Sequence, residues 1–172
     1  VRNAIEILQA SERPLMMSGT SVKWSQATAS LNAFISETHM PTCCNGMGRG
    51  TVPPDSPEFM NRARRAALQK ADCVVLAGTL LDFRMRFGAT IPKDAKIIQL
   101  DMDNVLMGQN RETDVPLVGN LACTFDLLLE EMKNQGVKLD YSPWRDELRA
   151  IENEEEAKVQ SKLGSDESPL DP

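Results

Sequence analysis

Residues 73–78 read Cys-Val-Val-Leu-Ala-Gly, an unbroken apolar run closed by a glycine. A run of this length is typical of a strand buried on both faces of a sheet. Similar short runs occur at 14–18, 41–44, 96–101 and 116–118. Longer segments with apolar residues at helical spacing separate them. This alternation predicts strands joined by helical crossovers, which require a parallel sheet.

The segments between the strands carry the helical pattern. Residues 25–39, 56–70 and 121–134 each place apolar side chains on one helical face. Ser56, with a proline after it, is a typical helix start, and Asn120 is placed to cap the third helix. We therefore predict an α/β protein with a three-layer, doubly wound sheet of about five to six parallel strands and helices on both faces.

The C-terminal part of the sequence differs from the rest. Residues 144–162 are predicted to form a charged helix that carries the acidic run 152–156, and residues 164–172 are predicted to join no core. An acidic run on a helix is typical of a solvated face. We therefore divide the chain into a domain, residues 1–135, and a linker helix with its tail, residues 136–172.

The composition limits the partners and the location. The 172 residues carry 19 Lys and Arg against 25 Asp and Glu, a net charge of −6. Nucleic-acid-binding domains need a clustered basic face, so this balance argues against DNA or RNA as a partner. No apolar run approaches the ~20 residues of a membrane-spanning helix. The four cysteines lie in apolar stretches without zinc-like spacing, which predicts reduced core thiols in a cytoplasmic protein: Cys43, Cys44, Cys73 and Cys123.

Four segments that directly follow predicted strands are candidate ligand contacts: 18–21, 46–50, 78–88 and 101–103. Ligands of open parallel sheets bind beyond the carboxyl ends of the strands, near the point where the strand order reverses. The small residues of the first segment let the backbone approach a diphosphate. In the third, Arg84 offers a bidentate phosphate contact, with Asp82 to hold it. In the fourth, Asp101 offers an acceptor for ribose hydroxyls.

Each segment also has an ordinary structural interpretation. The first would be a strand-to-helix turn, and the second, whose glycine spacing does not fit G-x-G-x-x-G, a flexible surface loop. The Asp-Arg pair of the third would be structural, with Phe83 and Phe87 filling the core. In the fourth, Asp103 would cap the short helix that follows. The residues alone leave both interpretations open.

Groups for catalysis are missing from the sequence. His39, the only histidine, ends a predicted helix and is expected to cap it or to face solvent. No order of Ser, His and Asp fits a hydrolase, and no His–carboxylate cluster suggests a metal site. A sheet of the dinucleotide-binding kind without such groups favours a binding or spacer domain.

Five stretches carry a resemblance to a known family: residues 10–20 (ASERPLMMSGT), 46–57 (GMGRGTVPPDSP), 66–88 (AALQKADCVVLAGTLLDFRMRFG), 96–103 (KIIQLDMD) and 114–120 (DVPLVGN). In order and spacing they resemble the central domain of thiamine-diphosphate-dependent enzymes of the acetolactate synthase and 2-hydroxyacyl-CoA lyase group. The resemblance covers about residues 1–135, and the helix with Trp144 is similar to the linker before the family's third domain. It implies a Rossmann-like parallel sheet.

The resemblance also implies what the parent enzyme would contain. In that family, thiamine diphosphate and Mg²⁺ bind between an N-terminal pyrimidine domain with an activating Glu and a C-terminal diphosphate domain with a G-D-G…N motif. Neither motif occurs in this sequence. The resemblance therefore implies a non-catalytic middle module of a homo-oligomeric C–C lyase or synthase. Such modules hold FAD in acetolactate synthases, ADP or the CoA adenylate in oxalyl-CoA decarboxylase relatives, and nothing in several decarboxylases, where they are purely structural.

Carried over position by position, the resemblance implies nine cofactor contacts: Gly19, Thr20, Cys44, Gly78, Asp82, Arg84, Asp101, Met102 and Asn120. The pattern of the FAD-binding members is met in part. The first arginine of their loop is Leu80 here, and the acid after the last strand is Asn120. Losing one charge-assisted phosphate contact lowers affinity by about one to two decades. The resemblance therefore predicts weaker nucleotide binding than in the FAD-binding members.

Overall fold

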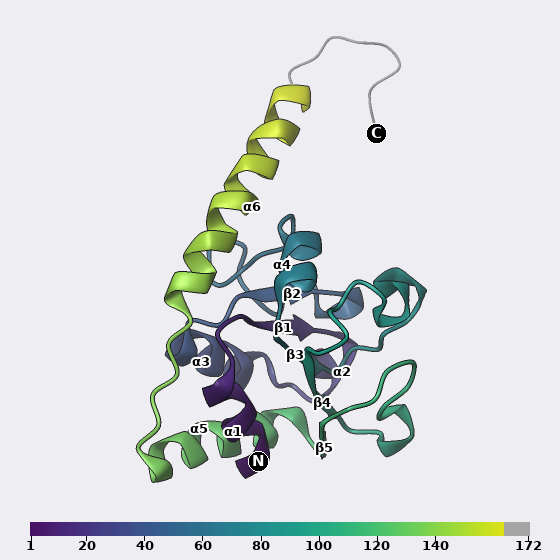
Figure 1. Ribbon diagram of the computed structural model, residues 1–172, viewed down its shortest axis with the longest axis vertical. Helices are drawn as coiled ribbons and strands as arrows, with labels where there is room; N and C mark the ends of the chain where they lie inside the picture. The colour runs from purple at the N-terminus through teal and green to yellow at the C-terminus, as the bar shows by residue number, and fades with distance from the viewer. Residues whose placement is uncertain (164–172) are drawn as a thin grey trace.

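The computed structural model describes residues 1–163 and contains a five-stranded sheet between two layers of helices (Figure 1). The strands are β1 (Pro14–Ser18), β2 (Thr42–Cys44), β3 (Cys73–Ala77), β4 (Lys96–Asp101) and β5 (Val115–Val118). All neighbouring strands are parallel, in the order β2-β1-β3-β4-β5. The predicted α/β, doubly wound fold is confirmed. The strand order reverses at β1, so the switch point lies between β1 and β3.

Residues 1–163 also form six α-helices and three short 3-10 helices. They are α1 (Arg2–Ala10), α2 (Thr20–Trp24), α3 (Thr28–Thr38), α4 (Arg64–Lys70), α5 (Leu121–Gln135), α6 (Ser142–Leu163), η1 (Gly46–Gly48), η2 (Phe83–Gly88) and η3 (Asn104–Leu106). The helices α1, α3 and α5 pack on one face of the sheet, and α4 and the first half of α6 pack on the other (Figure 1). The α6 helix then continues past the sheet (Figure 1).

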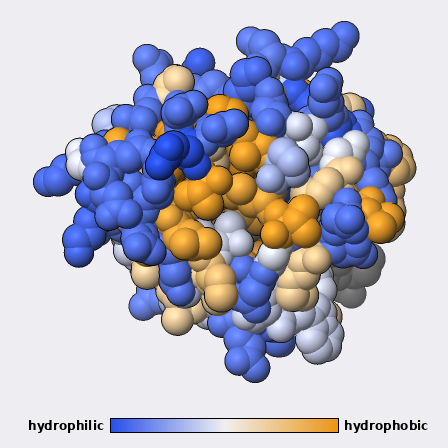
Figure 2. Space-filling view, turned by 90° about the horizontal axis from the view of Figure 1, so that it is seen from below, coloured by the Kyte–Doolittle hydropathy of each residue, from blue (hydrophilic) through white to orange (hydrophobic). Residues whose placement is uncertain are grey.

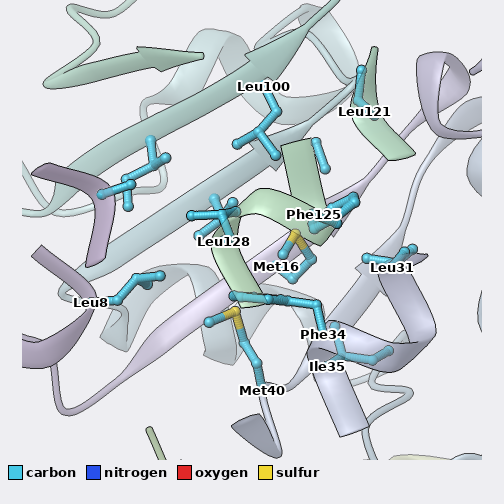
Figure 3. Packing of buried hydrophobic residues seen from close by; sticks show 14 of the residues in the cluster. Leu8, Met16, Leu31, Phe34, Ile35, Met40, Leu100, Leu121, Phe125 and Leu128 are labelled. Carbon is cyan, nitrogen blue, oxygen red and sulfur yellow. The ribbon is translucent and has the colours of Figure 1, made fainter. Parts of the chain in front are cut away.

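The strands bury side chains on both faces because successive residues point to opposite sides. Met16 and Val75 lie in the core beneath α1, α3 and α5, whereas Leu15 and Val74 lie in the core beneath α4 and α6. In the first core, the rings of Phe34 on α3 and Phe125 on α5 meet with centroids 5.7 Å apart (Figure 3). Unbroken apolar runs are therefore what these strands require.

The first predicted helix begins later than expected. The segment 25–39 becomes α3 only from Thr28, because Gln26 adopts a left-handed conformation (φ 54°) after the short α2. His39 ends α3 in the same conformation, so its capping role is confirmed. At the end of the sheet, Asn120 caps α5 as predicted, accepting the Ala122 N–H at 2.9 Å. Asp103 caps η3 by accepting the Val105 N–H.

The prediction that a helix begins at Ser56 is wrong, because α4 begins at Arg64. The intervening backbone pairs with the outer edge of β2 instead. Thr42 N–H donates to the Glu58 carbonyl at 2.7 Å, and Met60 N–H donates to the Thr42 carbonyl at 2.9 Å. This short parallel bridge uses backbone groups that a helix would have paired internally, so tertiary contacts override the local helix signal.

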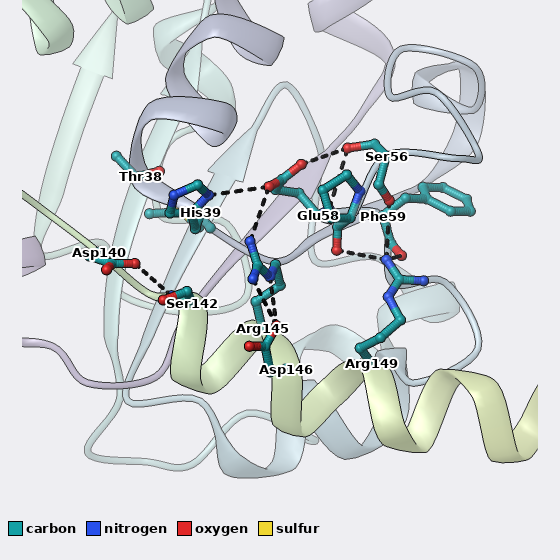
Figure 4. A network of polar contacts seen from close by, with 12 residues as sticks. Thr38, His39, Ser56, Glu58, Phe59, Asp140, Ser142, Arg145, Asp146 and Arg149 are labelled. Carbon is teal, nitrogen blue, oxygen red and sulfur yellow. Dashed lines mark hydrogen bonds and ion pairs between the residues drawn. The ribbon is translucent and has the colours of Figure 1, made fainter.

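The first half of α6 supplies the remaining partners of this segment (Figure 4). Arg149 Nη2 donates to the carbonyls of Ser56, Pro57 and Phe59 at 3.1, 2.6 and 2.9 Å. Arg145 lies 3.7 Å from the carboxylate of Glu58, which is itself buried. The α6 helix is therefore docked on this segment through two arginines, one that binds backbone carbonyls and one that pairs with a buried carboxylate.

The acidic run on α6 is not uniformly solvated, contrary to the prediction. Glu152 is only 8% exposed and accepts the N–H groups of Asn61 and Ala63. On the same helix Trp144 is buried and donates from its indole to the Pro14 carbonyl at 3.1 Å. The start of α6 therefore packs against the core of the predicted domain, residues 1–135. The predicted tail, 164–172, lies outside the described residues.

The cysteines correct one further prediction. Cys43, Cys44 and Cys73 are buried free thiols, as expected, but Cys123 on α5 is exposed. Among the helices of residues 1–163, none combines the length and apolar character needed to cross a membrane.

Candidate functional site

A cleft of about 220 Å³ opens at the carboxyl edge of the sheet, at the switch point between β1 and β3. Its walls come from the segments that follow β1, β2, β3 and β4. The lining residues are Thr20, Ser21, Asn45, Gly46, Gly78, Thr79, Leu80, Arg84, Asp101 and Leu106. This is the position where open parallel sheets bind their ligands.

The floor of the cleft is formed by two turns in close contact. A Cβ atom added to Gly19 would lie 2.3 Å from the Gly78 carbonyl oxygen, and one added to Gly78 would lie 2.6 Å from the Ser21 Cβ. Gly78 also has a left-handed φ of 63°. Backbone thus packs on backbone, and both positions require glycine. Gly19 supports the cleft from below without lining it.

Asp101 is the buried acid of the site, at 3% exposure. Its carboxylate accepts the Ser21 hydroxyl at 3.2 Å and the Met102 N–H at 2.7 Å. Ser21 follows β1 and Asp101 ends β4, so this hydrogen bond spans the cleft. A hydroxyl already occupies the carboxylate, and a carboxylate that binds one hydroxyl can bind another.

Arg84 is the cationic residue of the lining, and Asp82 holds it. The Asp82 carboxylate accepts the Arg84 backbone N–H at 2.9 Å through Oδ1, and the guanidinium Nε–H at 2.9 Å through Oδ2. The hydrogen bonds from the Arg84 side chain lower the pKa of Asp82 below its usual value. The predicted Asp-Arg pair is confirmed. The alternative that Phe83 and Phe87 fill the core is wrong, since they are 71% and 57% exposed.

The nine predicted contacts divide into three sets. Four line the cleft: Thr20, Gly78, Arg84 and Asp101. Gly19 and Asp82 lie directly behind it. The other three lie outside the lining. Cys44 is fully buried in the core, Met102 is 44% exposed beyond Asp101, and Asn120 uses its side chain to cap α5.

Three polar residues of the lining were not among the nine predicted contacts: Ser21, Asn45 and Thr79. Asn45 directly follows β2, and its Nδ2 donates to the Thr79 hydroxyl at 3.4 Å. Thr79 directly follows Gly78 at the end of β3. Ser21 and Thr79 lie in the candidate segments 18–21 and 78–88, whereas Asn45 is a polar residue immediately after a strand that the same rule would also have identified. Of the two glycines of η1, Gly46 lines the cleft, whereas Gly48 serves packing, since a Cβ on Gly48 would meet the Ser18 carbonyl oxygen at 2.5 Å.

The fold defines an α/β domain with a Rossmann-like, doubly wound parallel sheet, and comparison with known proteins gives the family. Residues 1–128 match the family model described as thiamine pyrophosphate enzyme, central domain. The chain belongs to this family.

Three relatives show the range of the family. The chain is 32% identical to a probable acetolactate synthase of Mycobacterium bovis over 169 residues, which are 98% of this chain and 30% of that protein. It is 33% identical to oxalyl-CoA decarboxylase of Escherichia coli over 171 residues, 99% of this chain and 30% of that protein. It is 31% identical to human 2-hydroxyacyl-CoA lyase 1 over 147 residues, which are 84% of this chain and 24% of that protein. The chain thus spans less than a third of these relatives.

The residues described do not fit the Mg²⁺-bound diphosphate of a thiamine enzyme. Within residues 1–163, no three side chains of His, Cys, Asp or Glu are grouped so that they could hold a metal ion. The cleft instead has hydroxyl and amide groups around a single buried carboxylate and one arginine. These groups fit the ribose and one phosphate of a nucleotide.

Proposed function

We propose that the cleft binds the adenylate part of FAD, ADP or coenzyme A within a thiamine-diphosphate-dependent C–C lyase or synthase. The observation that carries this proposal is the placement of Asp101 and Arg84 in one cleft at the switch point. The buried carboxylate of Asp101 would accept a ribose hydroxyl in place of Ser21. The Arg84 guanidinium would bind a phosphate, and Thr20 and Thr79 would offer hydroxyl donors.

The volume supports an adenylate rather than a whole dinucleotide. Pockets that enclose drug-sized ligands measure about 300–1,000 Å³, whereas this cleft measures about 220 Å³. Leu80 lines the wall where the FAD-binding pattern has an arginine. ADP or the adenylate of coenzyme A is therefore favoured over FAD.

Calorimetric titration of the 172-residue chain with ADP, coenzyme A and FAD tests this function. We expect ADP or coenzyme A to bind more tightly than FAD. Thr79→Val removes a hydroxyl from the cleft at nearly constant volume and should weaken nucleotide binding. The matched control, Thr28→Val, changes an exposed residue of α3 and should leave binding unchanged. If none of the three nucleotides binds, the cleft is not a nucleotide site.

A purely structural scaffold is the second candidate, supported by apolar surface at the same edge. Seven large apolar side chains at or after the carboxyl ends of the strands are at least 44% exposed: Trp24, Met47, Phe83, Phe87, Met102, Val105 and Val118. Seen from below, a further apolar patch lies near the middle of the face that carries α1 and α5 (Figure 2). Exposed patches of this kind mark protein contacts.

The remaining features of the parent enzyme are also proposals. Because the relatives are about three times longer than this chain, we propose a pyrimidine-binding and a diphosphate-binding domain that together hold thiamine diphosphate and Mg²⁺. We propose that the parent enzyme is a cytoplasmic homo-oligomer, and that the 172 residues alone have no catalytic activity. An assay of the isolated chain for decarboxylation of oxalyl-CoA or pyruvate, with thiamine diphosphate and Mg²⁺ added, would contradict this if product formed.

A further inference from the structure

We infer that Asp82 is a positioning residue for the phosphate site: it holds one edge of the Arg84 guanidinium and leaves the other edge for the ligand. This inference rests on the proposed nucleotide function and assigns the residue that controls its phosphate contact.

The hydrogen bonds define which edge of the guanidinium is occupied. A guanidinium has five N–H donors in a rigid, planar fork and can meet an anion through either of two edges. Asp82 Oδ2 accepts from both Nε and Nη2 of Arg84, so it occupies the Nε edge. The edge formed by Nη1 and the second hydrogen of Nη2 is left for a phosphate.

The position of Asp82 shows whether it could hold Arg84 for a ligand or would occupy the ligand's own place. Arg84 lines the cleft, whereas Asp82 does not. The carboxylate therefore acts from outside the lining and does not occupy the place of a ligand.

A second contact restrains the same guanidinium. Arg84 Cζ lies 5.7 Å from the centre of the Phe83 ring, which is 71% exposed and has no role in the core. The Arg84 side chain is 54% exposed, so without these contacts it would sample many rotamers. Fixing it before the ligand arrives reduces the entropy lost on binding.

One effect opposes this arrangement. The negative charge of Asp82 repels a phosphate, so its removal would strengthen binding if repulsion outweighed positioning. The sign of the change on substituting Asp82 therefore decides between the two roles.

The experiment compares ADP with adenosine, which lacks the phosphates, by calorimetric titration of the full 172-residue chain. Asp82→Asn keeps an oxygen that can accept the Arg84 backbone N–H but removes the charge that holds the guanidinium. We expect it to weaken ADP binding by about three- to tenfold and to leave adenosine binding unchanged. The control is Asp103→Asn, which alters the equivalent capping aspartate of η3; Asp103 accepts the Val105 N–H at 2.9 Å and lies outside the lining. It should change neither affinity.

A second experiment distinguishes loss of Arg84 positioning from general damage to the loop by the Asp82→Asn substitution. In Arg84→Ala, the added Asp82→Asn change should no longer weaken ADP binding, because the residue it positions is gone. Tighter ADP binding by Asp82→Asn alone would overturn the inference, as would unchanged ADP affinity or an equal loss for ADP and adenosine. If the unmodified chain binds neither compound, the proposed function itself fails. If it binds ADP but Asp82→Asn has no effect, only the positioning role fails.

Discussion

The carboxylate of Glu152 on α6 accepts the backbone N–H of Ala63 at 2.7 Å, across 89 residues of sequence. It also accepts the Asn61 N–H at 3.3 Å, and it is buried where it does so. A single acidic side chain thus satisfies two backbone donors of an irregular segment that has no helix or strand to pair them. The α6 helix therefore contributes hydrogen bonds that this segment needs.

Replacement of Glu152 should destabilise the domain. We expect Glu152→Ala to lower the free energy of unfolding by about 2–3 kcal/mol, since the buried N–H of Ala63 and the part-buried N–H of Asn61 lose a charged acceptor. Glu154→Ala is the matched control on the same helix, where the side chain is 68% exposed, and should cost about 0.5 kcal/mol or less. Urea unfolding followed by circular dichroism measures both. Equal costs for the two variants would contradict the role of Glu152.

The glycine contact beneath the cleft predicts a larger cost. Gly19→Ala would place a methyl group 2.3 Å from a carbonyl oxygen of the backbone, which cannot move aside as a side chain can. We expect a loss of about 3 kcal/mol in unfolding free energy. Gly136→Ala is the comparison, because Gly136 has a left-handed φ of 65° but no atom within 4 Å of the added Cβ. It should cost about 1 kcal/mol. Thermal and urea unfolding would show the difference.

The Lys96–Asp114 pair makes stability depend on pH. Burial opposes ionisation of Asp114, but the hydrogen bonds from Lys96 and from the Ile97 N–H outweigh it, so the pKa of Asp114 is lowered. A carboxyl whose pKa is lower in the folded state stabilises above its unfolded pKa, near 3.9, and loses this contribution as the pH falls through the folded value.

The Asp114→Asn variant tests this dependence. It should be less stable than the unmodified chain at pH 7, and the difference should shrink below about pH 4. Urea unfolding at a series of pH values measures it. A difference that stayed constant between pH 7 and pH 2.5 would show that Asp114 contributes only through uncharged contacts.

The four thiols should react at two rates. Cys123 is exposed on α5, whereas Cys43, Cys44 and Cys73 are buried. Burial raises the pKa of all three buried thiols, that of Cys73 to about 12. Since the thiolate is the reactive form, we expect one thiol to react with Ellman's reagent at pH 8 before unfolding and three more in guanidinium chloride. A Cys123→Ser variant should lose the fast phase. Two or more fast thiols in the native chain would contradict the buried set.

The strands of the sheet could be predicted from the sequence, but the conformation of the segment 56–63 beside β2 could not. Each strand is a short apolar run whose neighbours in the sheet are also buried, so composition and spacing identify it. The segment from Ser56 to Ala63 has a helix-start signal, but its backbone partners lie on β2 and on α6, about 90 residues away. Local sequence carries no information on such distant partners.

The candidate site was predictable to the extent that it follows strand ends. Thr20, Gly78 and Asp101 line the cleft because each lies within two residues of a carboxyl end, and Arg84 reaches it from η2 in the segment that follows β3. The rule that ligand contacts follow strand ends fails for Asn120, which follows β5 but uses its side chain to cap α5. It gives no sign that Cys44 turns into the core, because the facing of a strand's last residue depends on register.

The contact between Gly19 and Gly78 limits how this site can change during evolution. The base on which a ligand would rest is made of main chain, which is chemically the same whatever residues neighbour it. Selection can therefore alter only the walls, where Leu80, Arg84 and Leu106 project. A shift in ligand preference would then need few substitutions, all of them on the two loops that follow β3 and β4, which can vary without disturbing the strands beneath.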